Sequence, residues 1–287
     1  MRVPATAAAR RAGVPAGPAW LLRGRAAVTL GWRLVVLAAA LALWQGLSVS
    51  GVLPSDEFPS MTSTLSALWH QLGSSTLWAA VGGTLTAWAI GLLIAAVAAV
   101  VVGTLLGLNG FAYRSASPVI EFFKTIPVVA VLPIALVLYG PTLKERYVLV
   151  AFAVFWPLVI QVIYGVRSID PTVLDTARAL KVRRLRRFFV VVLPSAAPFI
   201  ATGLRVAAAV ALIVDIVAEL IGGGGNGVGV QLLAAQNSGP TAYPQMYAYI
   251  LVAGLLGVLL AGSFALAERR LLHWHETQRN IRTSHAV

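Results

Sequence analysis

Residues 170–194 read DPTVLDTARALKVRRLRRFFVVVLP, a strongly charged stretch between two long apolar runs. Two acids, Asp170 and Asp175, stand against many basic residues in this region. The basic residues are Arg167, Arg178, Lys181, Arg183, Arg184, Arg186 and Arg187. Because Lys and Arg resist transfer across a bilayer and favour its anionic inner leaflet, the stretch is predicted to be a cytoplasmic loop between two membrane spans.

The same stretch has the pattern of a short amphipathic helix. Asp170 is suited to cap free backbone N–H groups, and Pro171 is suited to the first turn. Apolar side chains then recur at roughly helical spacing, at Leu174, Ala177, Leu180, Leu185, Phe188 and Phe189. An amphipathic helix held between two spans is well placed to contact a soluble partner.

The composition is that of a membrane protein. Hydrophobic residues make up 59% of the 287 residues and charged residues only 11%, whereas soluble domains carry about 25% charged residues. The net charge of +12 lies mainly in the tails and loops, which argues against nucleic-acid binding. The chain has no cysteine, so disulfides and thiolate metal sites are excluded.

Six apolar segments are predicted to span the membrane. They cover residues 34–52, 84–108, 119–139, 147–164, 192–221 and 246–267. Pro127 and Pro133 are expected to bend the third span. Most Lys and Arg residues fall on one side of this arrangement, so both termini are predicted to be cytoplasmic. We expect an all-α membrane protein with six spans, with a disordered basic tail (1–26), a membrane domain (27–274) and a C-terminal tail (275–287).

Smaller features complete the predicted topology. Gly91, Gly103 and Gly107 are small positions that would let a neighbouring helix approach the second span closely. Residues 60–80 are expected to form an amphipathic helix at the outer interface, where Trp is favoured. Residues 141–146 are expected to form a short outer turn.

Five ionisable side chains fall within or close to the predicted spans: Glu121, Lys124, Arg205, Asp215 and Glu219. Charges at such depth cost about 2.5–3.5 kcal/mol for Arg, Lys or Asp at a helix centre, so they are expected to face protein or water. Asp215 and Glu219, four residues apart, share one helix face. Two interpretations stay open for them: they line a translocation path, or they pair structurally with a basic group or lie near the outer headgroups. Glu121 and Lys124 are expected to pair.

No catalytic, metal or nucleotide site is visible in the sequence. The run at 222–229, GGGGNGVG, lacks the Lys-Ser/Thr ending of a phosphate-binding loop and is placed outside by the predicted topology. It is interpreted as a flexible or re-entrant outer connection. The histidines form no ligand set, and neither a His-Glu-x-x-His pair nor a nucleophile elbow occurs.

The basic loop resembles the cytoplasmic signature of binding-protein-dependent ABC importer permeases: Glu-Ala-Ala, three residues, Gly, nine residues, Ile, one residue, Leu-Pro. Its positions fall, with every spacing kept, on Asp175, Thr176, Ala177, Lys181, Val191, Leu193 and Pro194. The replacement of the signature Gly by Lys181 is the most serious departure, because Gly allows a tight turn or close backbone approach that Lys is expected not to allow. Four further stretches, 124–127, 166–171, 203–205 and 218–220, are similar to permeases of the nitrate, sulfonate and taurine group.

The resemblance implies a homodimer of permease subunits, two cytoplasmic ABC ATPase subunits and an extracytoplasmic substrate-binding protein. It implies that the loop helix docks into a cleft on the ATPase. The residues expected to couple to the ATPase are Asp175, Thr176, Ala177, Arg178, Lys181, Leu193 and Pro194. This chain is expected to be non-catalytic and to hold no cofactor, with ATP and Mg²⁺ bound by the partner. The implied substrate is a small anion such as a sulfonate, taurine or nitrate, although related permeases also carry pyrimidine vitamin precursors.

Two other classes stay open. An ion-coupled secondary transporter would need a coupling-ion site, for which Asp215 and Glu219 are the candidates, but no inverted repeat is visible. A structural or assembly protein of the membrane would need no translocation path and would tolerate neutralisation of both acids.

Overall fold

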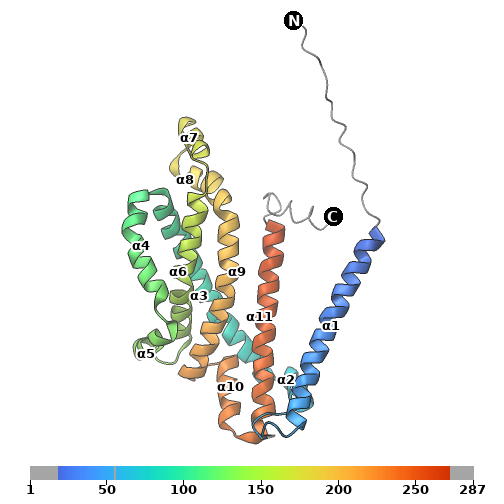
Figure 1. Cartoon of the computed structure of the whole chain (residues 1–287). Helices are drawn as coiled ribbons and strands as arrows, with labels where there is room; N and C mark the ends of the chain where they lie inside the picture. Colours follow the sequence, from blue (N-terminus) through green and yellow to red (C-terminus); the bar gives the residue numbers. More distant parts are fainter. Residues whose placement is uncertain (1–18, 55, 272–287) are drawn as a thin grey trace. The chain divides into compact units, whose positions relative to one another are not determined.

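The computed structural model describes residues 19–54 and 56–271, and every regular element in them is a helix (Figure 1). The elements are α1 (Ala19–Val49), α2 (Met61–Leu72), α3 (Ser75–Leu108), α4 (Gly110–Thr125), α5 (Val128–Tyr139), α6 (Leu143–Arg167), α7 (Pro171–Ala179), α8 (Arg184–Arg187), the π-helical turn η1 (Phe188–Val192), α9 (Leu193–Gly222), α10 (Val228–Asn237), the 3₁₀ turn η2 (Pro240–Ala242) and α11 (Tyr243–Leu271). Most of the predicted tails, residues 1–18 and 275–287, lie outside the described residues. α1 begins at Ala19 and therefore includes residues 19–26, which the sequence assigns to the tail.

Four described segments are long and apolar enough to cross a membrane: Gly31–Val49, Ser75–Leu108, Leu143–Arg167 and Pro240–Arg270. α4 and α5 together count as a fifth, with a bend of 86° between them. The bend lies at Pro127, as predicted, whereas α5 continues through Pro133. α9, which carries Arg205, Asp215 and Glu219, is not among these segments.

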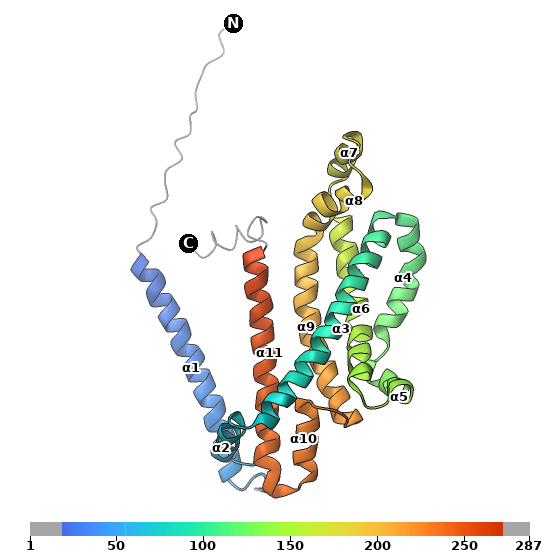
Figure 2. The same ribbon diagram turned by 180° about the vertical axis from the view of Figure 1, so that it is seen from behind.

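The core of the unit formed by residues 43–273 is built on α3, α6 and α9. A Cβ atom added to Gly91, Gly103 or Gly107 would lie 2.6–2.8 Å from a side chain of α6. The partners are Val150, Val162 and Val166, in that order. α3 and α6 therefore run parallel and in close contact (Figure 2), and the prediction that these glycines admit a neighbouring helix is confirmed.

Local capping places two helix boundaries differently from the sequence prediction. The single helix expected over residues 60–80 is wrong, because α2 ends at Leu72 and the Ser74 hydroxyl caps a new helix by accepting a hydrogen bond from the Leu77 N–H (3.2 Å). The outer turn expected over 141–146 is too long, because α6 already begins at Leu143 behind the N-cap Thr142.

α6 and α9 are antiparallel neighbours, with α7 and α8 at one end of the pair (Figures 1 and 2). The glycine-rich run and α10 lie at the opposite end. Residues of functional interest therefore gather at two opposite ends of the same helix pair.

Candidate functional site

The loop helix α7 begins as the sequence predicts. The Asp170 carboxylate accepts a hydrogen bond from the Thr172 N–H (2.8 Å), and Pro171 occupies the first turn. This contact, chiefly with the Thr172 backbone, holds the pKa of the Asp170 carboxyl below its usual value. The cap is therefore ionised at neutral pH.

α7 ends in a Schellman motif at the position that the resembled signature gives to Gly. Lys181 has a φ of +52°, in the left-handed region. Its N–H donates to Arg178 O (2.9 Å), and the Val182 N–H donates to Ala177 O (3.1 Å). The expectation that Lys does not allow this turn is wrong: Lys181 makes it, at a backbone cost of roughly 1–2 kcal/mol.

The described loop presents its expected coupling residues in different ways. Asp175 is 67% exposed and pairs with Arg178 at 2.7 Å, one helical turn away. The Thr176 hydroxyl donates to Thr172 O along the helix (2.7 Å), and Ala177 is buried. Of the two remaining residues, Leu193 is half-buried and Pro194 is exposed.

The exposed surface of the loop is apolar as well as basic. Leu180 and Leu185 are 73% and 76% exposed, and Val173 is also exposed. Around them stand the exposed arginines of the loop, Arg178, Arg183, Arg184 and Arg186. Such a mixed surface fits a protein partner with an apolar, acidic groove.

A π-helical turn joins the loop to α9. The Leu193 N–H donates to Phe188 O, five residues earlier, and Val192 beside it is buried. Because Pro194 has no N–H, a helix must adapt its bonding there, and the wider turn just before it lets the helix continue without a break. The junction at Leu193-Pro194 is therefore a continuous helical connection from α8 into α9.

A buried ion cluster lies at the opposite end of α6 and α9. Arg146 Nε donates to Asp215 Oδ1 (2.9 Å), and Nη2 contacts both Asp215 Oδ2 (3.3 Å) and Glu219 Oε1. The Arg146 side chain is 3% exposed and both carboxylates are fully buried. One guanidinium thus links two acids that stand one turn apart on α9.

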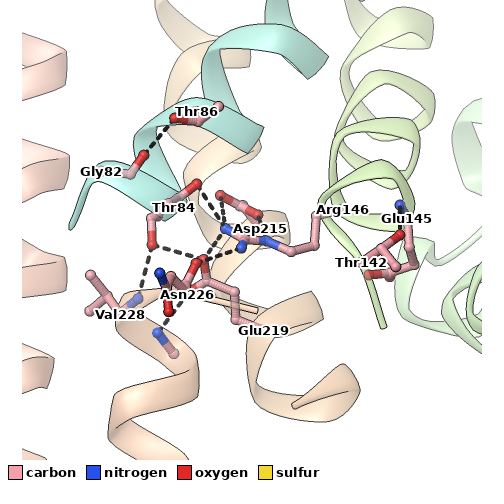
Figure 3. Close-up of polar contacts among 12 residues, drawn as sticks. Gly82, Thr84, Thr86, Thr142, Glu145, Arg146, Asp215, Glu219, Asn226 and Val228 are labelled. Atoms are coloured by element: carbon pink, nitrogen blue, oxygen red, sulfur yellow. Dashed lines mark hydrogen bonds and ion pairs between the residues drawn. The ribbon is translucent and has the colours of Figure 1, made fainter. Parts of the chain in front are cut away.

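Backbone groups and one hydroxyl complete the cluster. Arg146 Nη1 donates to Asn226 O (2.9 Å), and Nη2 also lies within hydrogen-bond distance of Gly83 O (3.3 Å). The Thr84 hydroxyl donates to Glu219 Oε1 (2.8 Å) and accepts the Val228 N–H (2.9 Å). The cluster therefore ties α3, α6, α9 and the glycine-rich run together (Figure 3).

The glycine-rich run is packed against this cluster. The Gly229 N–H donates to Glu219 Oε2 (2.7 Å), and a Cβ added at Gly229 would lie 2.7 Å from Ile216 O. A Cβ at Gly227 would collide with the Glu219 carboxylate itself. Glycine is needed here because the backbone approaches a buried acid closely. This packing contradicts the description of the run as flexible, whereas a re-entrant connection stays a prediction.

The structure decides part of the question left open for Asp215 and Glu219. They share one face of α9, as predicted, and they pair with a basic group, Arg146. A role in the translocation path stays a prediction. Sequence analysis missed Arg146 because it was assigned to a short outer turn. A signal was available in the sequence. Arg146 borders the outer end of the fourth predicted span, and Asp215 and Glu219 lie toward the outer end of the fifth.

Two further charged pairs lie along the helices. Lys124 pairs with Glu121 at 2.5 Å, as predicted. Arg205 of α9 pairs with Glu268 of α11 at 3.2 Å. No group of three or more His, Cys, Asp or Glu side chains within the described ranges is arranged to hold a metal ion.

Comparison with known proteins identifies the class to which this helical architecture and loop belong. Residues 96–273 match the family of binding-protein-dependent transport system inner membrane components. The chain belongs to this family and is an inner-membrane component of a binding-protein-dependent transport system.

Several permeases are similar in sequence. A nitrate import permease of Leptolyngbya laminosa is 32% identical over 172 residues, 60% of this chain and 61% of that protein, which is less than two thirds of its length. A putative aliphatic sulfonates transport permease of Bacillus subtilis is 26% identical over 86% of this chain and 89% of that protein. The taurine transport system permease of Escherichia coli is 26% identical over 89% of this chain and 92% of that protein.

Solved structures share the fold. A chain of the methionine ABC transporter in an inward-facing conformation aligns with a TM-score of 0.57 and 19% identity, over 68% of this chain and 95% of that one. A chain of a bacterial ABC transporter that imports alginate aligns with a TM-score of 0.60 and 15% identity, over 88% and 96%. At these identities the likeness shows the fold alone.

Proposed function

We propose that this chain forms the substrate pathway of an ATP-driven importer and couples to a separate ATPase through residues 170–194. The observation that carries the coupling role is the geometry of α7. It is a capped, Schellman-closed helix with an exposed apolar and basic surface. Because short connections join it to α6 and α9, a partner that moves α7 also moves the ends of both helices.

The topology that we propose has six spans and cytoplasmic termini. α9 supplies the sixth span, beside the four apolar segments and the bent pair α4–α5. Its three charged residues do not oppose this assignment, because Asp215 and Glu219 are buried against Arg146 and Arg205 pairs with Glu268. With this topology the basic loop and α7 lie in the cytoplasm, and the ion cluster lies toward the outer side.

The proposed assembly contains two copies of this permease, two ATPase subunits that hold ATP and Mg²⁺, and an extracytoplasmic substrate-binding protein. One solved alginate importer is described with its periplasmic protein bound, which supports the last partner by analogy of fold. The proposed substrate is a small anion such as a sulfonate, taurine or nitrate. The names of the three sequence relatives support this class.

Purification from native membranes tests the proposal. The chain is tagged at its C-terminus, extracted in mild detergent, and its co-purifying proteins are identified by mass spectrometry. We expect an ABC ATPase at about equal abundance, and its loss from Asp175→Lys, because the substitution removes the carboxylate that holds Arg178 at 2.7 Å and sets two cations one turn apart on α7. Asp56→Lys is the matched control, since Asp56 is also exposed but lies in a pocket with Pro240 and Thr241, outside residues 170–194.

The membrane levels of the wild-type chain, Asp175→Lys and Asp56→Lys are compared by immunoblot. If the wild-type chain and Asp175→Lys both purify without an ATPase, even after mild crosslinking, the coupling proposal is refuted. An ATPase retained equally by both would refute the role of Asp175 in docking while leaving the importer proposal in place.

A further inference from the structure

A charged pair stands at the break of the bent helix pair α4–α5. The Lys124 and Glu121 side chains are 39% and 55% exposed although they lie in a predicted span. α4 ends at Thr125, and α5 begins at Val128 without a side-chain cap. The chain is therefore charged, non-helical and sharply bent within two residues of Lys124.

Ring stacking fixes the depth of this break. The Phe123 ring stacks on Trp156 of α6, with centroids 4.7 Å apart and an angle of 7° between the planes. Trp156 lies near the middle of α6 (Leu143–Arg167), so each end of that helix is about 17–20 Å away at 1.5 Å per residue. Lys124, the next residue after Phe123, therefore lies at about the mid-depth of a spanning helix.

Both features of the break have the same physical requirement. Charged side chains at mid-depth are costly against lipid and face protein or a water-filled cavity. Broken helices at membrane depth likewise occur where they are covered by protein or line an aqueous cavity. Since Lys124 and Glu121 are exposed in this chain, their face of α4 fits the wall of an aqueous path.

We propose that Lys124 is the cationic contact for an anion passing through this permease, and this rests on the proposed function above. Its ammonium group pairs with Glu121 at 2.5 Å, and an anion competes with that carboxylate for the same group. The competition keeps the anion weakly held, as passage requires. The adjacent Trp156 Nε1 is buried and has no hydrogen-bond partner in the described part of the protein, so a second donor remains beside the break.

Thiol labelling tests whether the break is aqueous and favours anions. Thr125→Cys supplies the sole thiol, because the chain has no cysteine. Full-length protein in membrane vesicles is reacted with two water-soluble methanethiosulfonates, one carrying a sulfonate and one a trimethylammonium group. The ratio of their rates is normalised to that at Thr76→Cys, an exposed site in the first turn of α3.

A unit charge about 6 Å away in a water-like dielectric changes each rate by about threefold, in opposite directions for the two reagents, so Lys124 alone would give a ratio of about tenfold. Because the Glu121 carboxylate paired with Lys124 reduces this factor, we expect the normalised ratio to favour the anionic reagent by at least about threefold. Lys124→Met should abolish the preference and Lys124→Arg should retain it. Lys144→Met, which removes an exposed lysine at the start of α6, should leave it unchanged. Ethanesulfonate, used as a probe anion, should slow labelling at Thr125→Cys and lose this effect in Lys124→Met.

Three outcomes overturn the proposal: no reaction of Thr125→Cys with either reagent, a ratio that Lys124→Met leaves unchanged, or ethanesulfonate protection that survives Lys124→Met. The assay needs neither an ATPase nor a binding protein. A negative labelling result would therefore refute the role of Lys124 alone. The importer proposal is tested separately, by whether an ATPase co-purifies with the tagged chain.

Discussion

The buried ion cluster makes a strong prediction about stability. Arg146→Met removes the cation that contacts Asp215, Glu219, Asn226 O and Gly83 O, and leaves two buried carboxylates facing each other. Removing one partner of a buried ion pair costs about 3–5 kcal/mol. Because two acids lose the same partner here, we expect a value toward the upper end of that range.

The measurement is unfolding in mixed micelles by titration with SDS, followed by the fluorescence of the chain's 8 tryptophans. Lys144→Met is the matched control, since it removes a lysine that lies over the Tyr139 ring at 4.8 Å, two residues from Arg146. It should cost less than about 1 kcal/mol. Arg146→Met combined with Asp215→Asn and Glu219→Gln should recover part of the loss, because the triple variant no longer leaves these two buried carboxylates without their cation.

An Arg146→Met protein that unfolds at the same SDS fraction as the wild type would refute the reasoning. A triple variant less stable than the single one would show that hydrogen bonding outweighs charge balance in the cluster. Comparing the single with the triple variant therefore separates the contribution of hydrogen bonding from that of charge balance.

Two further substitutions test the loop and the core with the same assay. Lys181→Gly should stabilise the protein by up to about 1 kcal/mol, because Gly adopts the φ of +52° without strain. The control Leu180→Gly, at a φ of −75°, should destabilise it. Equal effects of the two substitutions would contradict the strain argument. Gly103→Leu should lower the free energy of unfolding by about 1–3 kcal/mol or more through its clash with Val162. The control Gly254→Leu, with open space around its Cβ position, should lower it little. A stable Gly103→Leu protein would show that α3 and α6 separate easily.

The helical class could be predicted from the sequence because its signals are local. Apolar runs and the distribution of Lys and Arg need no knowledge of which helices touch. The cap at Asp170 and the break at Pro127 were equally accessible, since each depends on its neighbours in the chain. Arg146 was not accessible in this way. Its partners lie 69 and 73 residues away, and its helix starts earlier than hydropathy indicates.

Lys181 shows a different limit of sequence reasoning. The signature position predicts a backbone that favours Gly, and the structure has that backbone in the left-handed region. The residue itself predicts the opposite, because a side chain at positive φ is strained. The two hydrogen bonds of the Schellman motif, from the Lys181 and Val182 N–H groups, help to offset that cost. The sequence shows that the signature position and the residue in it favour different backbone conformations. Only the structure shows that the backbone of the signature position is kept.

The two sites lie at opposite ends of one helix pair, and this has a mechanical consequence. α6 carries Arg146 at its start and leads into the coupling loop at its end, whereas α9 leaves that loop and carries Asp215 and Glu219 near its far end. The ion cluster clamps the helices where they are farthest from α7. If the loop couples to an ATPase as proposed, we expect its motion to turn α6 and α9 together about the clamp, because sliding one past the other would break buried charge contacts. Arg146→Met should consequently weaken transport more than it weakens ATPase binding. Equal losses of both would show that the cluster serves folding alone.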